Sequence, residues 1–413
     1  MNTFRNWLLA FAAVVVSGLP LTTLAEESAK SFTDAVVAGD ANLNLRYRYE
    51  FVDQDGFDEN ANASTLRIRL NYKTAQWQDW SGFVEMDYVG EVLVNDFNSA
   101  QGTSSPDRGQ YPVVADPKGA DLNQLYFDYK VSADMLLRFG RQRILLDNQR
   151  FVGGVGWRQN EQTYDGVSLR YSGLSNAKIF YSFVGNVNRI FGDTVNAGDH
   201  NVDAHLLNAR IGLNDNWSIT PYFYYIDNED ALANSTSTVG VRLVGKTALS
   251  AGSLSFVAEM ASQSDAADAP VSYDAKYFHI DVNWAMSNGL GLGIGVESLG
   301  GDNNNAGMAF RTPFATLHAF QGWADKFLAT PSAGMNDFYF SARVGIEKWK
   351  LAAIYHDFSA ESGSADYGTE LDLSASRKLT DRYGLLLKAA FFNSDNIGYA
   401  DTNKISVMLT AGF

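Results

Sequence analysis

The segment from Asn42 to Phe51, NLNLRYRYEF, alternates apolar and polar residues without interruption. Because successive side chains of a β-strand point to opposite faces, this pattern predicts a strand with one apolar face and one charged face. In a soluble sandwich the apolar face would cover a core. In a membrane barrel it faces lipid, and the charged face lines a water-filled interior. One strand fits both, so the rest of the chain decides between them.

The same alternation recurs in about eighteen segments, among them Thr65–Tyr72 and Lys404–Phe413. The centres of their apolar faces carry almost no charge, and a basic residue at the bilayer midplane would cost roughly 2–4 kcal/mol. Connections alternate in length, with long polar stretches such as Asn95–Lys118 and Leu299–Gly334 at one end only. We therefore predict an all-β fold: a transmembrane antiparallel β-barrel of the outer membrane with about 18 strands. An even strand number places both termini in the periplasm.

The N-terminus has the features of a secretory signal. Arg5 precedes an apolar run, Trp7–Val16, and Thr23-Leu24-Ala25 offers small residues before a cleavage point ahead of Glu26. The run is too short for a spanning helix, which needs roughly 20 apolar residues. The predicted division is a signal peptide (1–25), a periplasmic lead (26–40) and a single barrel (41–413), inserted in the outer membrane of a Gram-negative bacterium.

Composition excludes several classes of chemistry. Cysteine is absent, so disulfides, thiol catalysis and cysteine zinc sites are ruled out. The net charge of −15 argues against a nucleic-acid partner. The five histidines form no zinc pair, and the acidic loop with Asp53, Asp55 and Asp58 lacks the full calcium-loop spacing. We expect no metal and no cofactor.

The predicted inward faces carry many charges. The first two strands contribute Arg46, Arg48, Arg67 and Arg69, and later strands add both basic and acidic residues (Arg170, Arg210, Arg242, Arg343; Glu85, Asp87, Glu91, Asp128, Glu259, Asp281, Glu297, Glu370, Asp372). Two interpretations stay open. The charges neutralise one another as a structural network, or the arginines form a positive lane for an anionic solute, because guanidinium pairs bidentately with carboxylates.

The stretch Phe139–Gly166, FGRQRILLDNQRFVGGVGWRQNEQTYDG, places Arg141, Arg143, Arg150 and Arg158 among Gly, Asn and Gln. A segment this polar and glycine-rich predicts a loop folded into the lumen as a constriction; the alternative is an external loop held by salt bridges. Arg141 and Arg143 follow the outward Phe139 at intervals of two residues, so a regular strand would point both arginines outward as well. The strand therefore either bulges near Gly140 or ends there.

These motifs resemble the alginate-export family of outer-membrane porins. The likeness lies in Phe139–Gly166, in His318–Tyr339 (HAFQGWADKFLATPSAGMNDFY) and in Tyr355–Leu379 (YHDFSAESGSADYGTELDLSASRKL). It implies an eighteen-stranded barrel with an arginine-rich constriction that passes an anionic uronic-acid polymer. The final strand, with its alternate apolar residues and terminal Phe413, resembles the signal read by the barrel-assembly machinery.

The predicted function is a passive outer-membrane porin for anionic oligo- or polysaccharides, alginate or its oligomers first, with lipid around the barrel. The predicted substrate path consists of Arg46, Arg48, Arg67, Arg69, Arg141, Arg143, Arg150 and Arg158. The alternative is a general diffusion porin in which charges only brace the barrel. A hydrolase at the barrel rim would need a Ser–His arrangement. His279 and His356 have no marked serine partner, so we expect no enzyme.

Overall fold

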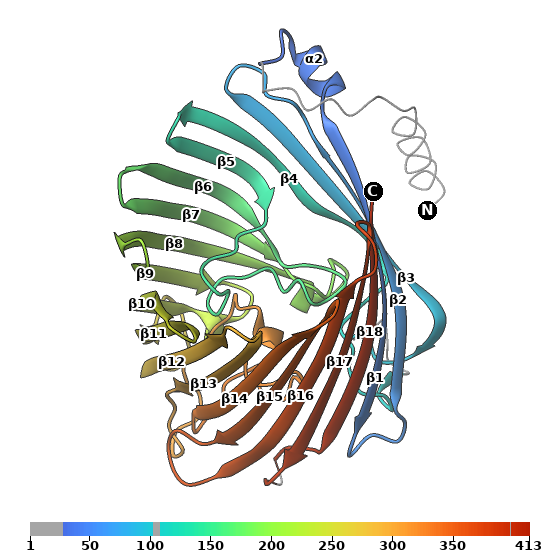
Figure 1. Ribbon diagram of the computed structural model, residues 1–413, viewed down its shortest axis with the longest axis vertical. Coiled ribbons are helices and arrows are strands. Elements are labelled where there is room, and N and C mark those ends of the chain that lie inside the picture. The colour runs from blue at the N-terminus through green and yellow to red at the C-terminus, as the bar shows by residue number, and fades with distance from the viewer. Residues whose placement is uncertain (1–27, 102–107, 397) are drawn as a thin grey trace.

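The computed structural model describes residues 28–101, 108–396 and 398–413, so the predicted signal peptide lies outside the described residues. The described residues form eighteen strands of one sheet, which encircles the interior of the molecule (Figure 1). The strands are β1 Asp40–Gln54, β2 Ala61–Lys73, β3 Trp80–Asp96, β4 Gly119–Ser132, β5 Met135–Gln142, β6 Thr163–Leu174, β7 Ala177–Asn188, β8 Asp199–Asn214, β9 Trp217–Asn228, β10 Thr236–Leu249, β11 Gly252–Asp265, β12 Asp274–Met286, β13 Leu290–Leu299, β14 Met335–Ile346, β15 Trp349–Ser359, β16 Asp366–Lys378, β17 Tyr383–Ser394 and β18 Thr402–Gly412. Short 3-10 helices cover η3 Asn196–Gly198, η4 Leu232–Asn234 and η5 Leu317–Ala319.

The sheet closes because its first strand pairs with two neighbours. Tyr47 of β1 lies opposite Leu66 of β2 on one side and opposite Leu409 of β18 on the other, both antiparallel. Closure leaves no unpaired edge, which is the condition for a sheet to span a membrane. The predicted all-β, eighteen-stranded antiparallel barrel is confirmed.

Burial is inverted relative to a soluble protein. On the outer face Phe127 is 55% exposed, whereas Arg48 on the inner face is 1% exposed. Water-soluble folds bury large apolar residues and expose charged ones. An apolar exterior around a polar interior is the arrangement expected of a barrel in lipid.

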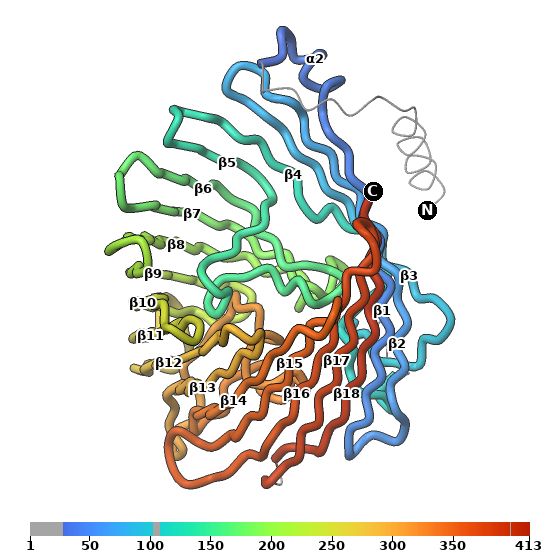
Figure 2. Tube along the Cα trace, viewed as in Figure 1, coloured from blue at the N-terminus to red at the C-terminus, as the bar shows by residue number. Residues whose placement is uncertain are grey.

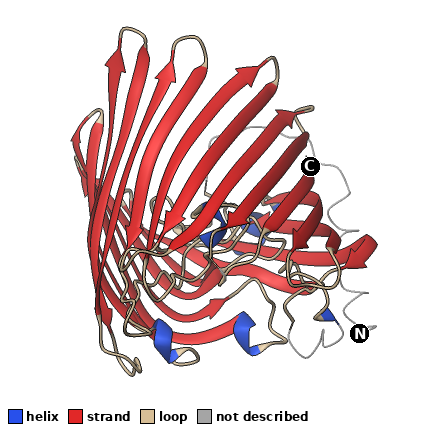
Figure 3. Cartoon of the chain, turned by 90° about the horizontal axis from the view of Figure 1, so that it is seen from below, coloured by secondary structure: helices blue, strands red, loops and turns tan. Residues whose placement is uncertain are grey.

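Connections differ between the two ends of the barrel. Most of those at one end are tight turns, such as 133–134, 215–216 and 347–348, and we call this the short-turn end. The other end carries the long loops, including 143–162 and 300–334, as the sequence predicts. Figure 3 shows the tight hairpins along one edge and the loops gathered toward the other.

Two long loops fold into the barrel rather than away from it (Figure 2). We call the loops 143–162 and 300–334 together the plug. Two apolar clusters anchor them to the inner wall. Phe151 and Phe310 of the plug pack with Tyr222 of β9, and Phe327 packs with Phe358 of β15, its ring centroid 4.7 Å away. The plug is therefore a packed part of the fold.

A short helix, α2 Phe32–Val37, interrupts the lead before the first strand, where the sequence analysis assigns no element. The Ser31 hydroxyl caps it by accepting from the Asp34 amide at 3.1 Å. The Ala35 carbonyl accepts from the Ala75 amide at 3.0 Å, which fixes the helix at the short-turn end.

No helix among the described residues is long and apolar enough to cross a membrane.

Candidate functional site

The arginines of β1 point inward, as their parity predicts, and hold the backbone of loop 143–162. Arg46 donates to the Gly156 carbonyl at 2.8 Å and to the Gln159 side chain at 2.9 Å. Arg48 donates to the Trp157 carbonyl and is ion-paired with Glu50. Both guanidinium groups are buried, so in this arrangement they fix the plug to the wall.

The arginines of β2 are neutralised by carboxylates. Arg69 Nε lies 2.7 Å from Asp87 Oδ1 of β3, and a second guanidinium nitrogen reaches Glu161 of the plug. Arg67 Nη1 lies 3.8 Å from the same Glu161. Burial alone would raise the pKa of Glu161, but the positive charges of Arg69 and Arg143 outweigh it and lower that pKa to about 2. Glu161 is therefore ionised at neutral pH and bridges plug and wall.

Arg141 and Arg143 separate at the end of β5. The sequence predicts a bulge near Gly140 or a strand end there. The strand instead continues two residues past Gly140, whose φ is +118°, and ends at Gln142. A Cβ at Gly140 would lie 2.3 Å from the Leu125 carbonyl oxygen, so glycine is required for this approach. Arg141 pairs with Asp165 of β6 at 2.8 Å, whereas Arg143 lies beyond the strand and pairs inward with Glu85 at 3.0 Å.

Arg150 and Arg158 tie the two loops of the plug together. Arg150 Nε lies 2.7 Å from Glu297 of β13, and its Nη2 donates to Gln321 of loop 300–334 at 3.2 Å. Arg158 Nη2 lies 2.9 Å from Asp325 of the same loop. Burial alone would lower the pKa of each arginine, but the facing carboxylates raise both. Both arginines are therefore positively charged, and each is ion-paired in this arrangement.

The structure thus brings seven of the eight predicted path residues to the contact between plug and wall, where each is hydrogen-bonded or ion-paired (Arg46, Arg48, Arg67, Arg69, Arg143, Arg150, Arg158). Arg141 is held separately by Asp165. In this arrangement these contacts follow the structural-network interpretation. The role of the eight arginines as a path for solute stays a prediction.

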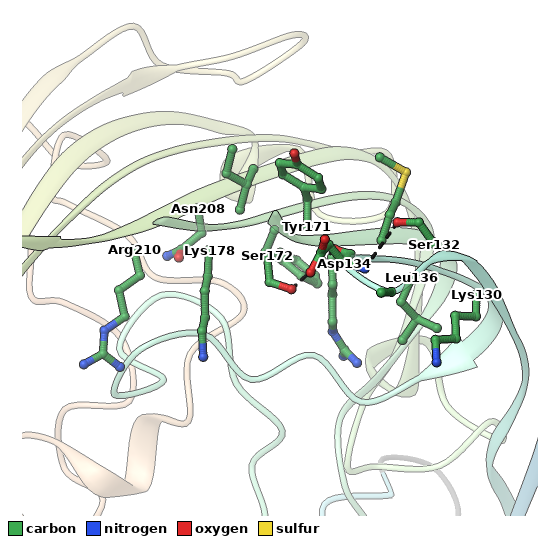
Figure 4. Close-up of a pocket in the computed structure, with 14 residues that line it drawn as sticks. Lys130, Ser132, Asp134, Leu136, Tyr171, Ser172, Lys178, Asn208 and Arg210 are labelled. Carbon is green, nitrogen blue, oxygen red and sulfur yellow. Dashed lines mark hydrogen bonds between the residues drawn. The ribbon is translucent and has the colours of Figure 1, made fainter. Parts of the chain in front are cut away.

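Other basic residues are free of such partners. A cavity of about 510 Å³ at the short-turn end is lined by Lys130, Arg170, Lys178 and Arg210, against a single carboxylate, Asp134. Figure 4 shows Lys130, Lys178 and Arg210 extending from the strands on the same side. Among the described residues these four cations have no salt-bridge partner within 4.0 Å.

Two of these cations face each other directly. Lys178 of β7 lies opposite Arg210 of β8 in the strand register. Like charges opposite one another in a sheet destabilise it unless something neutralises them. Arg170 and Arg210 are among the predicted inward residues, but none of the four cations belongs to the predicted path. Alternation along each strand gives the inward direction of Arg170 and Arg210, whereas their grouping with Lys130 and Lys178 depends on the strand register.

The histidines considered for hydrolase chemistry have other hydrogen-bond partners in this structure. Within the described ranges no three His, Asp or Glu residues are grouped to hold a metal ion. His356 bonds to Asp337 at 2.8 Å and His279 to Tyr339 at 2.9 Å. In the part of the chain that the structure describes, neither histidine has a hydrogen bond to serine, which a Ser–His nucleophile would need.

Residues 39–292, more than half of the chain, match the family model described as "Alginate export". The chain belongs to the alginate export family. A search of curated proteins finds no match.

Solved structures agree with this fold. Pseudomonas aeruginosa OccK11 (OpdR) is 15% identical with a TM-score of 0.68, covering 96% of this chain and 99% of that chain. P. aeruginosa OpdL gives 15% identity and a TM-score of 0.68, with 91% and 99% covered. Acinetobacter baumannii OccAB4 gives 11% and 0.67, with 91% and 98% covered. This alginate export family member is an outer-membrane β-barrel channel with the fold of these proteins.

Proposed function

We propose that the channel passes anionic, carboxylate-bearing saccharides, alginate or its oligomers first, by passive diffusion. The observation that supports this most is the cavity with Lys130, Arg170, Lys178 and Arg210, four cations opposed by one carboxylate. Unpaired basic side chains on a concave wall raise the local concentration of anions. Lysine and arginine are also the side chains that bind carboxylates by charge-assisted hydrogen bonds.

The pair Lys178–Arg210 sharpens the preference for anions. Two cations at opposed register positions repel each other, and a solute carboxylate between them would remove that repulsion. Arg210 can bind a carboxylate bidentately, whereas Lys178 acts as a point charge. An uncharged sugar of the same size would gain neither contact.

The predicted arginine path enters this proposal at a second stage. Arg46, Arg67 and Arg69 are engaged by loop 143–162 of the plug, so a solute meets them only when this loop moves. Glu161, the carboxylate partner of Arg67 and Arg69, travels with the plug. Its departure would leave Arg67 without a carboxylate partner, whereas Arg69 would stay paired with Asp87 of β3. We place both termini and the short-turn end in the periplasm, with the long loops outside the cell.

A second candidate is a general diffusion porin. It is favoured by the carboxylate partners of seven of the eight predicted arginines, such as Asp87 for Arg69. In that function the charges only brace the barrel, and solutes are selected by size.

Planar-bilayer recording of the refolded channel separates the two. We expect the reversal potential in a KCl gradient to indicate anion selectivity. Replacing two of the four cavity cations, Lys178→Met together with Arg210→Met, should reduce that selectivity severalfold. The matched control is Lys348→Met, which removes an exposed lysine from the turn 347–348 outside the cavity. Cation selectivity, or equal effects of the two variants, would leave the general porin.

A further inference from the structure

One lysine on the inner wall touches both loops of the plug. Lys388 of β17 places its ammonium nitrogen 3.6 Å from the ring centroid of Trp323 and 4.2 Å from that of Trp157. The same nitrogen lies 2.8 Å from His318 Nε2. Trp157 belongs to loop 143–162, and the other two residues belong to loop 300–334. A single wall cation thus holds both loops.

None of these contacts is with an anion. Lys388 has no carboxylate within 4.0 Å among the described residues. His318 Nδ1 donates to Asp325 Oδ1 at 2.7 Å, which makes Nε2 the acceptor from Lys388. The ammonium is therefore held by a neutral nitrogen and two aromatic faces, each of which is weaker than a carboxylate.

Nearby carboxylates do not reach the ammonium. None lies within 4.0 Å of it among the described residues, although Asp372 Oδ1 is buried there without a hydrogen-bond partner. Glu50, on the same small cavity, is ion-paired with Arg48, and Asp372 accepts from the Trp323 amide at 3.1 Å. The neighbouring wall lysine shows the contrast. Lys404 of β18 also reaches loop 300–334, but its Nζ lies 2.7 Å from Asp325 Oδ2. Lys388 differs because its acceptor, the neutral His318 Nε2, can be replaced by a carboxylate, which binds an ammonium group more strongly.

We propose that Lys388 binds the carboxylate of a uronate unit and that this binding releases the plug. The proposal rests on the proposed function, and it adds a specific site and a coupling. The carboxylate takes the hydrogen bond that Lys388 gives to His318 and draws the ammonium out from between Trp157 and Trp323. Both loops then lose their contact with the same wall residue.

The size of the site couples binding to movement. The cavity beside Lys388, lined also by both tryptophans, has room for about 10 Å³, roughly one water molecule. A sugar acid enters only when the tryptophans move apart. Trp157 Nε1 is buried with no acceptor among the described residues, so a donor for a sugar oxygen is already present.

The test is single-channel recording with a mannuronate trimer added at the short-turn end, and maltotriose as the neutral counterpart. In the unmodified channel we expect the trimer to raise the opening frequency about tenfold, which corresponds to about 1.4 kcal/mol of differential binding. Maltotriose should leave the frequency unchanged. Lys388→Met should abolish the response, and Lys388→Arg should retain it.

Lys326→Met is the matched control, because Lys326 ties loop 300–334 to Thr402 of β18 at 2.9 Å and does not line the cavity beside Lys388. It removes a second lysine that holds the same loop, so openings without ligand should increase while the response to the trimer remains. A full response in Lys388→Met, or loss of the response in both methionine variants, would overturn the proposal. If Lys388→Met does not refold, Lys388→Gln is recorded in its place. Loss of its response to the trimer is expected, and a full response would overturn the proposal.

The two proposals fail differently. Anion selectivity without any response to the trimer would refute the role of Lys388 and leave the proposed function standing. Loss of both selectivity and response would refute both. Tryptophan emission on addition of the trimer gives an independent readout, because Trp157 and Trp323 flank the amine. A change in the unmodified protein that persists undiminished in Lys388→Met would also overturn the proposal.

Discussion

Arg158 Nη2 lies 2.9 Å from Asp325 Oδ2, and this ion pair joins loops 143–162 and 300–334, which fold into the barrel. Asp325 also accepts from Lys404 of the wall and from His318 of its own loop. Burial alone would raise the pKa of Asp325, but His318, Lys404 and Arg158 hold it well below its usual range. One ionised carboxylate therefore connects loop to loop and loop to wall.

Asp325→Asn should loosen the plug. The substitution keeps the size of the side chain but removes the charge that compensates three buried donors, and breaking a buried ion pair in this way costs about 3–5 kcal/mol. We expect more frequent openings and a larger mean conductance in planar bilayers. Asp302→Asn, on the same loop near the barrel end, is the control and should behave like the unmodified channel. Equal conductance in both variants would contradict the role of Asp325.

Acid should open the plug through His318. Burial lowers the pKa of His318 from 6.5 to about 3, so the side chain is neutral in the closed arrangement. When the loop moves away from the wall, His318 is no longer buried, and its pKa returns to the ordinary value of 6.5. Stabilisation of the closed plug is then complete above pH 6.5 and is lost as pH falls toward 3, by about 1.4 kcal/mol per pH unit.

The molecular reason is the loss of an acceptor. Protonated His318 cannot accept from Lys388 and would place two cations 2.8 Å apart. Opening frequency recorded from neutral to about pH 4 checks this. His318→Gln, which cannot titrate, should flatten the dependence, while His205→Gln on the exposed outer surface should leave it unchanged. A steep acid response in His318→Gln would exclude this histidine as its source.

Charge on the outer face should destabilise the barrel according to depth. Leu207 lies at the middle of β8 and is 42% exposed, and Leu213 lies near the end of the same strand on the same face. Leu207→Arg should lower the free energy of unfolding by about 2–4 kcal/mol, and Leu213→Arg by about 0–1 kcal/mol. Denaturant unfolding in lipid vesicles measures both. Equal losses would mean that Leu207 does not sit at the bilayer midplane.

The last residue should matter for assembly more than for stability. The Phe413 amide donates to the Leu43 carbonyl at 2.9 Å, and its ring packs on Tyr383 with centroids 6.2 Å apart. Phe413→Ser keeps the backbone bond, so refolding in detergent should be nearly unchanged. We propose that the aromatic ring of Phe413 is part of an assembly signal, so insertion into the outer membrane of cells should fall severalfold. Tyr383→Ser removes the same ring contact and keeps that signal. An equal loss of insertion in the two variants would assign the effect to packing.

The strands were predictable because their information is local. Each β-strand needs only alternate apolar and polar residues, and segments such as Asn42–Phe51 carry that pattern in full. The inward direction of Arg170 and Arg210 followed from parity alone. The four-residue group with Lys130 and Lys178 required knowing which strands are neighbours and at which register.

The contacts of the plug could not be read from the sequence. Arg46 bonds to Gln159, and Arg150 pairs with Glu297, so the partners lie more than a hundred residues apart along the chain. The alternation of residues along a strand cannot predict such pairs, because one partner of each pair lies in a loop and loops have no periodic sequence pattern. The sequence therefore identified an arginine-rich segment that enters the lumen, and only the three-dimensional arrangement shows which charges are occupied and which are free.

The seam between β1 and β18 has a consequence for the timing of folding. Its register runs from Asn44 opposite Gly412 to Gln54 opposite Thr402, so the first strand made by the ribosome pairs with the last. Neither strand can complete its hydrogen bonds until synthesis of the chain has ended. Until then both edges remain open to pairing with other chains. The two edge strands therefore need protection from other chains until they pair with each other.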